Sequence, residues 1–116
     1  MHKKLEVWQL SMNLVQDIYK ISKTYPKDEI YGLTNQMRRC AVSIPSNIAE
    51  GAARKGDKEF IQFLYIALGS AAELETQLLI SQSLQYSFNQ EYLHNLSRVK
   101  QMLYALIKYK EGRKKN

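Results

Sequence analysis

Hydrophobic residues recur every three or four positions along most of the chain, in four separate stretches. In the first stretch, residues 5–25, apolar side chains form one stripe, which Leu14, Ile18 and Ile21 widen, and polar side chains fill the positions between. This spacing predicts an amphipathic helix, and Pro26 ends it. The stripe consists of Leu5, Trp8, Met12, Val15, Tyr19 and Ser22.

The second stretch begins near Asp28 and contains a proline. The side-chain oxygen of Asp28 can accept hydrogen bonds from the first free amides of a helix, so we expect Asp28 to cap it. Pro45 lies inside the apolar pattern, where it removes one backbone amide and crowds the preceding turn. We therefore expect a kink near Pro45. The core positions of this helix are Ile30, Leu33, Met37, Cys40, Ala41, Ile44 and Ile48.

Two short polar segments separate the remaining stretches. Gly56 can end the second helix in a left-handed conformation, and Asp57 can cap the next one. The third helix is expected over residues 58–86. Ser87 and Gln90 have the spacing of a capping box, which predicts the start of the fourth helix.

The third helix has little charge on either face. A helix that is nearly uncharged all round is usually buried on more than one side. A four-helix monomer buries only one broad face of each helix, so the surplus apolar surface indicates self-association. The small residues at positions 69–72 would let another backbone come close. The outer face includes Tyr65, Ile66, Ala72, Gln77 and Ser81.

Four helices with short connections predict an all-α fold, an antiparallel up-down four-helix bundle with its second helix kinked near Pro45. The length of 116 residues is enough for one hydrophobic core and too short for two. We expect a single domain over residues 1–110. After Lys110 the apolar pattern dissolves, so residues 111–116 are expected to form a mobile basic tail.

Positive charge is distributed unevenly. The net charge is +6, yet residues 59–97 contain no Lys or Arg. Such a field attracts polyanions, including nucleic acid, although lysines also serve simply to keep a chain soluble. No apolar run has the length that a bilayer requires, so no membrane partner is expected. The candidate phosphate contacts are Arg54, Lys55, Lys58, Lys108, Lys110, Arg113, Lys114 and Lys115.

The usual constellations of catalytic and metal-binding residues are missing. The five glycines lack the spacing of a phosphate-binding loop. His2, His94 and the single cysteine, Cys40, do not make a zinc site. Ser43 and Ser46 have no general base placed beside them by the sequence. We therefore expect no catalytic, cofactor-binding or metal-binding residue, and no enzyme. The lone cysteine and the lack of a secretory signal favour the cytoplasm.

The segment 43–51, Ser-Ile-Pro-Ser-Asn-Ile-Ala-Glu-Gly, is the most unusual local feature. Pro45 leaves a carbonyl one turn earlier without its amide partner, and nearby polar side chains can satisfy it. One interpretation is a polar network that fixes the bend. The other is an anion or partner site, with Arg54 and Lys55 close by. The motif residues are Pro45, Asn47, Glu50 and Gly51.

Two acids of the third helix lack a basic neighbour in sequence. Glu73 and Glu75 need either solvent or a cation from another element. Arg38 and Arg39 on the second helix are the obvious candidates. We expect at least one such pair to join the second and third helices, or to join two subunits.

Several of these segments together resemble a known family. They are Val7-Trp8-Gln9, Tyr31-Gly32-Leu33, Gln36 with Arg38-Arg39, the segment 43–51, Glu59-Phe60 with Phe63-Leu64, and Gly69-Ser70 followed by Glu73-Leu74-Glu75-Thr76-Gln77. In this order they resemble the bacterial four-helix bundle proteins encoded within 23S rRNA intervening sequences. The accessory variability protein of diversity-generating retroelements is similar. The likeness covers residues 5–106, and Cys40 stands where alanine is usual.

The resemblance implies an up-down bundle, often a ring-like homopentamer, without catalysis. For the retroelement relatives it implies binding to nucleic acid and to a reverse transcriptase. We therefore expect an oligomeric bundle that binds RNA or DNA through its basic surface. No helix-turn-helix signature is evident, so sequence-specific recognition is not expected. The alternative is a protein-interaction scaffold, for example for a reverse transcriptase or another acidic partner.

Overall fold

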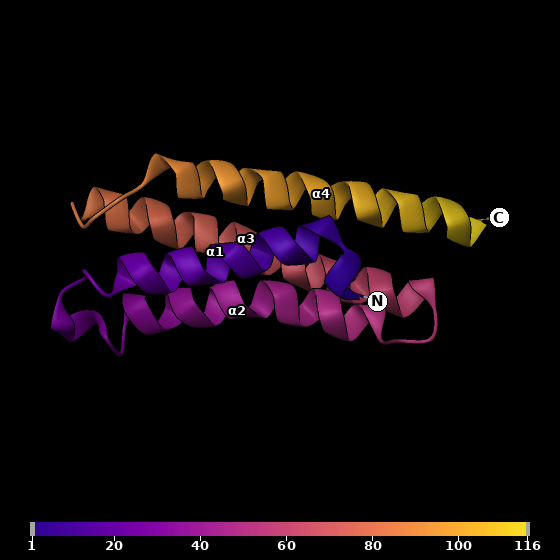
Figure 1. Cartoon of the computed structure of the whole chain (residues 1–116), viewed down its shortest axis with the longest axis horizontal. Coiled ribbons are helices and arrows are strands. Elements are labelled where there is room, and N and C mark those ends of the chain that lie inside the picture. Colours follow the sequence, from indigo (N-terminus) through magenta and orange to yellow (C-terminus); the bar gives the residue numbers. More distant parts are fainter. Residues whose placement is uncertain (1, 116) are drawn as a thin grey trace.

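The computed structural model describes the backbone of residues 2–115 and the side chains of residues 2–112. Over this range the chain is all-α, and four long helices lie side by side in an elongated bundle of 51 × 22 × 20 Å (Figure 1). The helices run alternately up and down, which confirms the predicted fold. They are α1 (Glu6–Ser22), α2 (Leu33–Ala52), α3 (Asp57–Ser83) and α4 (Gln90–Lys115), with 3₁₀ turns η1 (His2–Lys4) and η2 (Lys27–Glu29).

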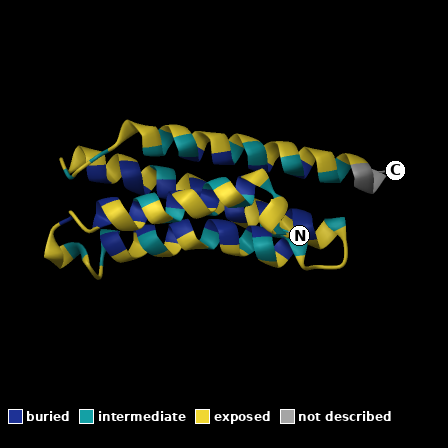
Figure 2. Cartoon of the chain, viewed as in Figure 1, coloured by how far each residue is buried: buried dark blue, intermediate teal, exposed yellow. Residues whose placement is uncertain are grey.

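Each helix packs against the next one along the chain, and α1 also packs against α4. No described Cα atom of α1 lies within 8 Å of a Cα atom of α3, so these two helices are diagonal. Buried residues recur along the length of the bundle (Figure 2), and the buried hydrophobic residues of all four long helices belong to one core cluster. The core therefore forms one continuous column.

The face of α1 that is buried in the core is not centred on the stripe of residues expected from the sequence. Leu14 and Ile18 are almost completely buried, whereas Met12 and Tyr19 are more than one third exposed. The difference arises because the apolar surface of α1 is wider than the core it meets. The helix centres on Leu14 and Ile18, and the other edge of its apolar surface remains open beside α2.

The start of α2 differs from the expectation. Asp28 lies exposed in η2 and does not cap the helix, which begins at Leu33 after Gly32. Instead the Oε1 atom of Glu29 accepts a hydrogen bond of 3.2 Å from the amide of Leu33. With the short 3₁₀ turn η2 in place, the carboxylate that reaches the start of α2 is that of Glu29, one residue after Asp28. Helix α2 then continues through Pro45 without interruption, and the kink there stays a prediction.

The next two boundaries also use other residues. Gly56 is extended, with φ −132° and ψ 162°, and precedes α3 rather than ending α2 in a left-handed conformation. Asp57 is the first residue of α3, not its cap. At the start of α4 the Oδ1 atom of Asn89 accepts a hydrogen bond of 2.9 Å from the amide of Glu91. Asn89 therefore caps α4 in place of the expected pair of Ser87 and Gln90.

Helix α4 extends to Lys115, so the helical backbone continues past Lys110, where the apolar pattern ends. We expect residues 111–116 to be mobile. This stays a prediction, because the side chains of residues 113–116 lie outside the described part. One helix, α3, is long and apolar enough to cross a membrane by length and composition alone. In the bundle its inner face carries ten buried side chains and packs against α2 and α4, which accounts for much of its apolar composition.

Candidate nucleic-acid interface

Three basic segments that are far apart in the sequence meet at one end of the bundle. The turn between α2 and α3, the C-terminal half of α4 and the N-terminal η1 all lie toward the same end (Figure 1). An ion pair joins two of them, because the Nζ atom of Lys110 lies 3.5 Å from the Oδ1 atom of Asp57. We call this region the basic end. It comprises Lys3, Lys4, Arg54, Lys55, Lys58, Lys108 and Lys110.

Arg54 is held in place by its own chain. Its guanidinium lies 3.1 Å from a carboxylate oxygen of Glu50 and 4.0 Å from one of Glu59. It also lies over the ring of Phe63, with the central carbon 4.9 Å from the ring centroid. The two carboxylates offset the charge of Arg54, so this residue orders the turn more than it adds to the positive field.

Lys110 likewise has a structural partner. Its side chain is only 16% exposed, and its ammonium group contacts the Asp57 carboxylate and the ring of Phe60, 5.2 Å from the centroid. These contacts attach the last turns of α4 to the start of α3. Lys110 is therefore less available to a phosphate than its charge alone suggests, and its role as a phosphate contact stays a prediction.

Three other candidates are available to a partner. Lys55, Lys58 and Lys108 are exposed, and none of the ion pairs between side chains of residues 2–112 includes them. They come from the turn, the first turn of α3 and the outer side of α4. The remaining candidates, Arg113, Lys114 and Lys115, have side chains that lie outside the described residues.

Lys3 and Lys4 join the basic end although sequence reasoning did not include them in the site. The turn η1 folds back onto α1 and α2. The Nε2 atom of Gln9 donates a hydrogen bond of 2.8 Å to the carbonyl of Lys3. The rings of His2 and Trp8 pack edge to face, with their centroids 5.2 Å apart. These contacts hold two exposed lysines near the end of α2. The only signal in the sequence is the lysine pair itself.

The motif 43–51 forms local contacts rather than one site. The Nδ2 atom of Asn47 donates to the carbonyl and to the hydroxyl of Ser43, at 2.8 and 2.9 Å. These bonds support the interpretation of a polar network on α2. They do not reach the carbonyl of Ala41, which is the one that Pro45 leaves without its amide. Glu50 faces outward to Arg54.

Gly51 has a packing role. A Cβ atom at this position would lie 2.7 Å from the Cβ of Phe63 and 2.9 Å from Cδ1 of Phe60. The end of α2 therefore approaches α3 closely only because residue 51 has no side chain. This contact also brings the turn that carries Lys55 against the start of α3.

A polar hollow of about 480 Å³ lies farther along the same seam between α2 and α3. The hydroxyls of Ser43 and Ser70 are 2.8 Å apart, and the Cys40 thiol donates to the carbonyl of Ser70 at 3.1 Å. Burial, and then the nearby charge of Glu73, raise the pKa of Cys40 to about 12. The hollow is lined by Gln36, Arg39, Cys40, Ser43, Ser70 and Glu73.

The expected arginine–glutamate pairs do not form within one chain, where no ion pair of the described side chains joins them. Glu75 pairs with Lys100 of α4 at 3.1 Å. Arg38 donates to the hydroxyl of Ser22 at 2.8 Å and lies over the ring of Tyr19. Arg39 and Glu73 line the same hollow and are both exposed. A contact of either with another subunit stays a prediction.

No group of three or more His, Cys, Asp or Glu side chains suited to a metal ion occurs in the part of the chain that the structure describes. In the polar hollow the Cys40 thiol lies beside the carboxylate of Glu73, whose charge helps to raise the pKa of the thiol. Cys40 is the most nucleophilic side chain there, and its raised pKa keeps it protonated.

Comparison with known proteins places the chain in a family. The sequence model of the 23S rRNA-intervening sequence protein family matches residues 3–108, so the chain belongs to this family. No curated protein matches the chain. A crystal structure of a protein with unknown function from the S23 ribosomal protein family of Bacteroides thetaiotaomicron has the same fold. It aligns with a TM-score of 0.79 and 24% identity, over 88% of this chain and 95% of that one.

Proposed function

We propose that this member of the 23S rRNA-intervening sequence family is a non-enzymatic, oligomeric bundle that binds nucleic acid through its basic end. The observation that supports the proposal is the convergence of η1, the α2–α3 turn and α4. Each contributes exposed lysines to one region, and Lys55, Lys58 and Lys108 have no carboxylate partner among the described side chains. Unpaired lysines in a cluster are the ordinary means of contacting phosphates.

The chemistry of the basic end favours binding without strong sequence preference. Lysines hold phosphates as point charges and do not read base edges. The turn that carries Lys55 and the short η1 do not present a free helix to a groove. In a ring-like homopentamer five basic ends would act together, and each would add phosphate contacts. The free thiol of Cys40 fits a reducing compartment, so we propose the cytoplasm as the location.

Binding across a salt series tests this proposal. The full-length protein is titrated against labelled duplex RNA and duplex DNA, with its mass measured by light scattering in the same buffers. We expect an oligomer whose affinity falls steeply with salt, because each neutralised phosphate releases condensed counterions. The affinities for unrelated sequences of one polymer should agree within a few-fold. An oligomer that binds neither RNA nor DNA at low salt would contradict the proposal and favour an acidic protein partner, such as a reverse transcriptase.

A further inference from the structure

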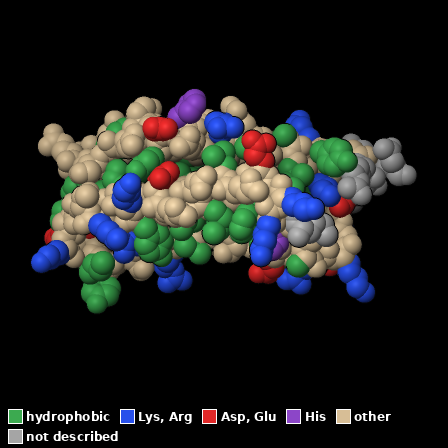
Figure 3. Space-filling view, viewed as in Figure 1, with side chains coloured by type: hydrophobic (Ala, Val, Ile, Leu, Met, Phe, Trp, Pro, Cys, Tyr) green, Lys and Arg blue, Asp and Glu red, His purple; other side chains and the backbone are tan. Residues whose placement is uncertain are grey.

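A second group of basic side chains surrounds a pocket at the end of the bundle opposite the basic end. The pocket has a volume of about 300 Å³ and lies between the end of α1, the turn η2 and the first turns of α2. Lys and Arg side chains lie at this end of the face seen in Figure 3, on the left of the view. We call it the corner pocket. Its charged lining residues are Lys23, Lys27 and Arg38, and its hydroxyl-bearing ones include Ser22 and Thr34.

The positive charge of the corner pocket is not neutralised by neighbouring side chains. None of the ion pairs between side chains of residues 2–112 includes Lys23, Lys27 or Arg38. No carboxylate is among the described residues that line the pocket. Like charges held close together repel one another, and an anion between them removes this cost. The pocket therefore favours a negatively charged ligand.

The acids nearest in sequence to the pocket do not line it. Glu29 is engaged elsewhere, because its two carboxylate oxygens accept hydrogen bonds from the Leu33 amide and the Tyr86 hydroxyl, at 3.2 and 2.8 Å. Asp28 is exposed and is not a lining residue. The turn η2 thus contributes Lys27 to the pocket while its two carboxylates lie outside the lining.

The guanidinium of Arg38 is held in place before any ligand binds. Its Nε atom donates to the Ser22 hydroxyl at 2.8 Å, and a terminal nitrogen donates to the Tyr19 carbonyl at 3.4 Å. Its central carbon also lies 4.7 Å from the centroid of the Tyr19 ring. The other N–H groups have no partner among the described residues. An ordered guanidinium with free N–H groups is suited to a phosphate or carboxylate.

The hydroxyl of Thr34 is buried without a partner. Thr34 is only 3% exposed and lines the pocket. Its hydroxyl forms no hydrogen bond with the described residues, and a buried hydroxyl in this state is unfavourable. Thr34 also belongs to the first turn of α2, where free backbone amides and the helix dipole attract anions. An oxygen atom of an anionic ligand would satisfy these groups.

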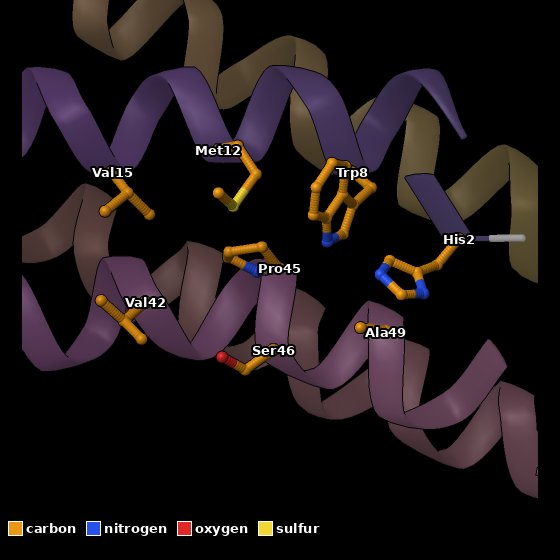
Figure 4. A pocket seen from close by; sticks show the side chains of 8 residues that line it. All are labelled: His2, Trp8, Met12, Val15, Val42, Pro45, Ser46 and Ala49. Carbon is orange, nitrogen blue, oxygen red and sulfur yellow. The ribbon is translucent and has the colours of Figure 1, made fainter. Parts of the chain in front are cut away.

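The opposite part of the seam between α1 and α2 differs in its chemistry. There Trp8, Met12 and Val15 point toward Val42 and Pro45 around a groove of about 310 Å³ (Figure 4). No Lys, Arg, Asp or Glu is among the described residues that line this groove. The two hollows are similar in size, so charge and not space distinguishes the corner pocket. Its volume is at the lower end of the range for sites that hold small molecules.

We propose that the corner pocket binds the phosphate group of a small phosphate monoester. A monoester carries a charge of about −1.5 to −2 near pH 7 and three terminal oxygens, whereas a diester carries one charge and two such oxygens. Three cations and a free hydroxyl match the monoester better. Pro26 and Ile30 complete the lining with apolar surface for the organic part. This site goes beyond the proposed function, which concerns the diester phosphates of nucleic acid at the other end of the bundle.

Calorimetric titration of the full-length protein with matched nucleotides tests the proposal. Adenosine 5′-monophosphate carries a monoester, and adenosine 3′,5′-cyclic monophosphate presents the same base and sugar with a diester. Adenosine is the control without phosphate, and inorganic phosphate is the control without an organic part. At physiological ionic strength we expect the monoester to bind at least about tenfold more tightly than the cyclic diester. Inorganic phosphate should bind more weakly than the monoester, and adenosine should not bind.

Variants locate the binding to the corner pocket. Arg38→Gln should weaken binding of the monoester by about tenfold or more, and Thr34→Val by about two- to tenfold, as for the loss of hydrogen bonds to a charged and to a neutral donor. Lys27→Gln removes a charge at an exposed position, so the variant should fold, and it should also weaken binding. Lys20→Gln removes the same charge from an exposed position of α1 outside the pocket and should have no effect. Circular dichroism checks the fold of each variant.

Several results would overturn the inference. Equal affinities for the monoester and the cyclic diester would remove the distinction that the three cations are proposed to make. Tighter binding of inorganic phosphate than of the monoester would indicate a site for the free anion only. Folded Lys27→Gln and Thr34→Val with unchanged affinity would place the ligand elsewhere, as would an equal loss in Lys20→Gln.

The two ends of the bundle can be tested separately. Lys55→Gln at the basic end should leave binding of the monoester unchanged, and Lys27→Gln should leave binding of duplex DNA unchanged. Loss of monoester binding in Lys55→Gln would contradict the corner pocket as its site. A protein that binds the monoester but no nucleic acid would refute only the proposed function.

Discussion

Gly51 lies where the last turn of α2 meets α3, and its environment leaves no room for a side chain. A Cβ atom would approach the Cβ of Phe63 to 2.7 Å and the carbonyl oxygen of Phe60 to 3.3 Å. Because two of these neighbours belong to the rigid part of α3, the helices must separate to accept a methyl group. The glycine in the motif 43–51 is therefore explained by packing between helices.

The substitution Gly51→Ala should lower the free energy of unfolding by roughly 1–3 kcal/mol, the usual range for overpacking. Chemical denaturation followed by circular dichroism measures it. Gly112→Ala is the matched control, since a Cβ added at Gly112 would meet no neighbouring atom within 4 Å. The control should leave stability unchanged or raise it by up to about 1 kcal/mol. Equal stability of both variants would show that α2 and α3 are not this close.

Cys40 should be almost unreactive in the folded protein. Its thiol is buried and donates to the Ser70 carbonyl, and its pKa rises from 9.0 to about 12. At pH 8 the thiolate is then roughly a thousandfold scarcer than in the unfolded chain. Alkylation by iodoacetamide, followed by mass spectrometry with and without denaturant, tests this. Equal rates in the two conditions would contradict the burial of Cys40.

The same shift gives a dependence on pH. The folded state keeps the Cys40 proton to higher pH than the unfolded state, so its contribution to stability is complete below pH 9. The contribution is lost progressively as the pH rises from about 9 to about 12, because the unfolded chain loses the proton first. Cys40→Ala should therefore make stability fall less steeply in this alkaline range, as measured by denaturation at a series of pH values.

At the scale of the element, the seam between α2 and α3 contains polar contacts as well as apolar ones. The hydroxyls of Ser43 and Ser70, 2.8 Å apart, link the two helices beside the Cys40 thiol. Asn47 donates to the same Ser43 hydroxyl and so orients it. This linkage fixes the register of α2 on α3, and thereby where the α2–α3 turn carries its lysines.

A double-mutant cycle on Ser43→Ala and Ser70→Ala should give a coupling free energy of roughly 0.5–1.5 kcal/mol, as for an ordinary internal hydrogen bond. The free energies come from denaturation of the two single variants and the double variant. Ser43→Ala combined with Ser83→Ala is the control, because the Ser83 hydroxyl bonds within its own turn to Ile80. A Ser43–Ser70 coupling free energy no larger than that of the control would show that this contact does not stabilise the packing of α2 on α3.

Helix type and order could be predicted from the sequence, because apolar spacing of three and four residues specifies helices directly. Helix boundaries could not be predicted as well. Several side chains compete for the first amides of a helix, and Glu29 and Asn89 take the positions expected of Asp28 and Ser87. The face of α1 was also missed, because Leu14 and Trp8 are equally apolar and only packing against two neighbours decides which is buried.

At the scale of the whole molecule, the positions of the basic residues could be predicted from the sequence, but the carboxylates that pair with some of them could not. Arg54 and Lys110 look like Lys55 in the sequence, yet Arg54 pairs with Glu50 one turn earlier and with Glu59 of α3, and Lys110 pairs with Asp57 of α3. Lys3 and Lys4 could not be assigned to the site, since only the fold brings η1 to the end of α2. For Lys110 the difference between an exposed charge and a paired one is set by a contact between elements distant in the chain.

The most direct test of the central claim compares two sets of three lysines. Lys55, Lys58 and Lys108 lie at the basic end, and Lys20, Lys23 and Lys27 are exposed at the opposite end. Changing either set to glutamine removes the same charge. The affinity for duplex DNA is then measured against salt. We predict that the change at the basic end weakens binding and reduces the slope of log K against log salt by about 3 for each engaged copy, whereas the change at the opposite end leaves the slope unaltered. Equal effects of the two sets would show that net charge alone, and not the basic end, attracts the nucleic acid.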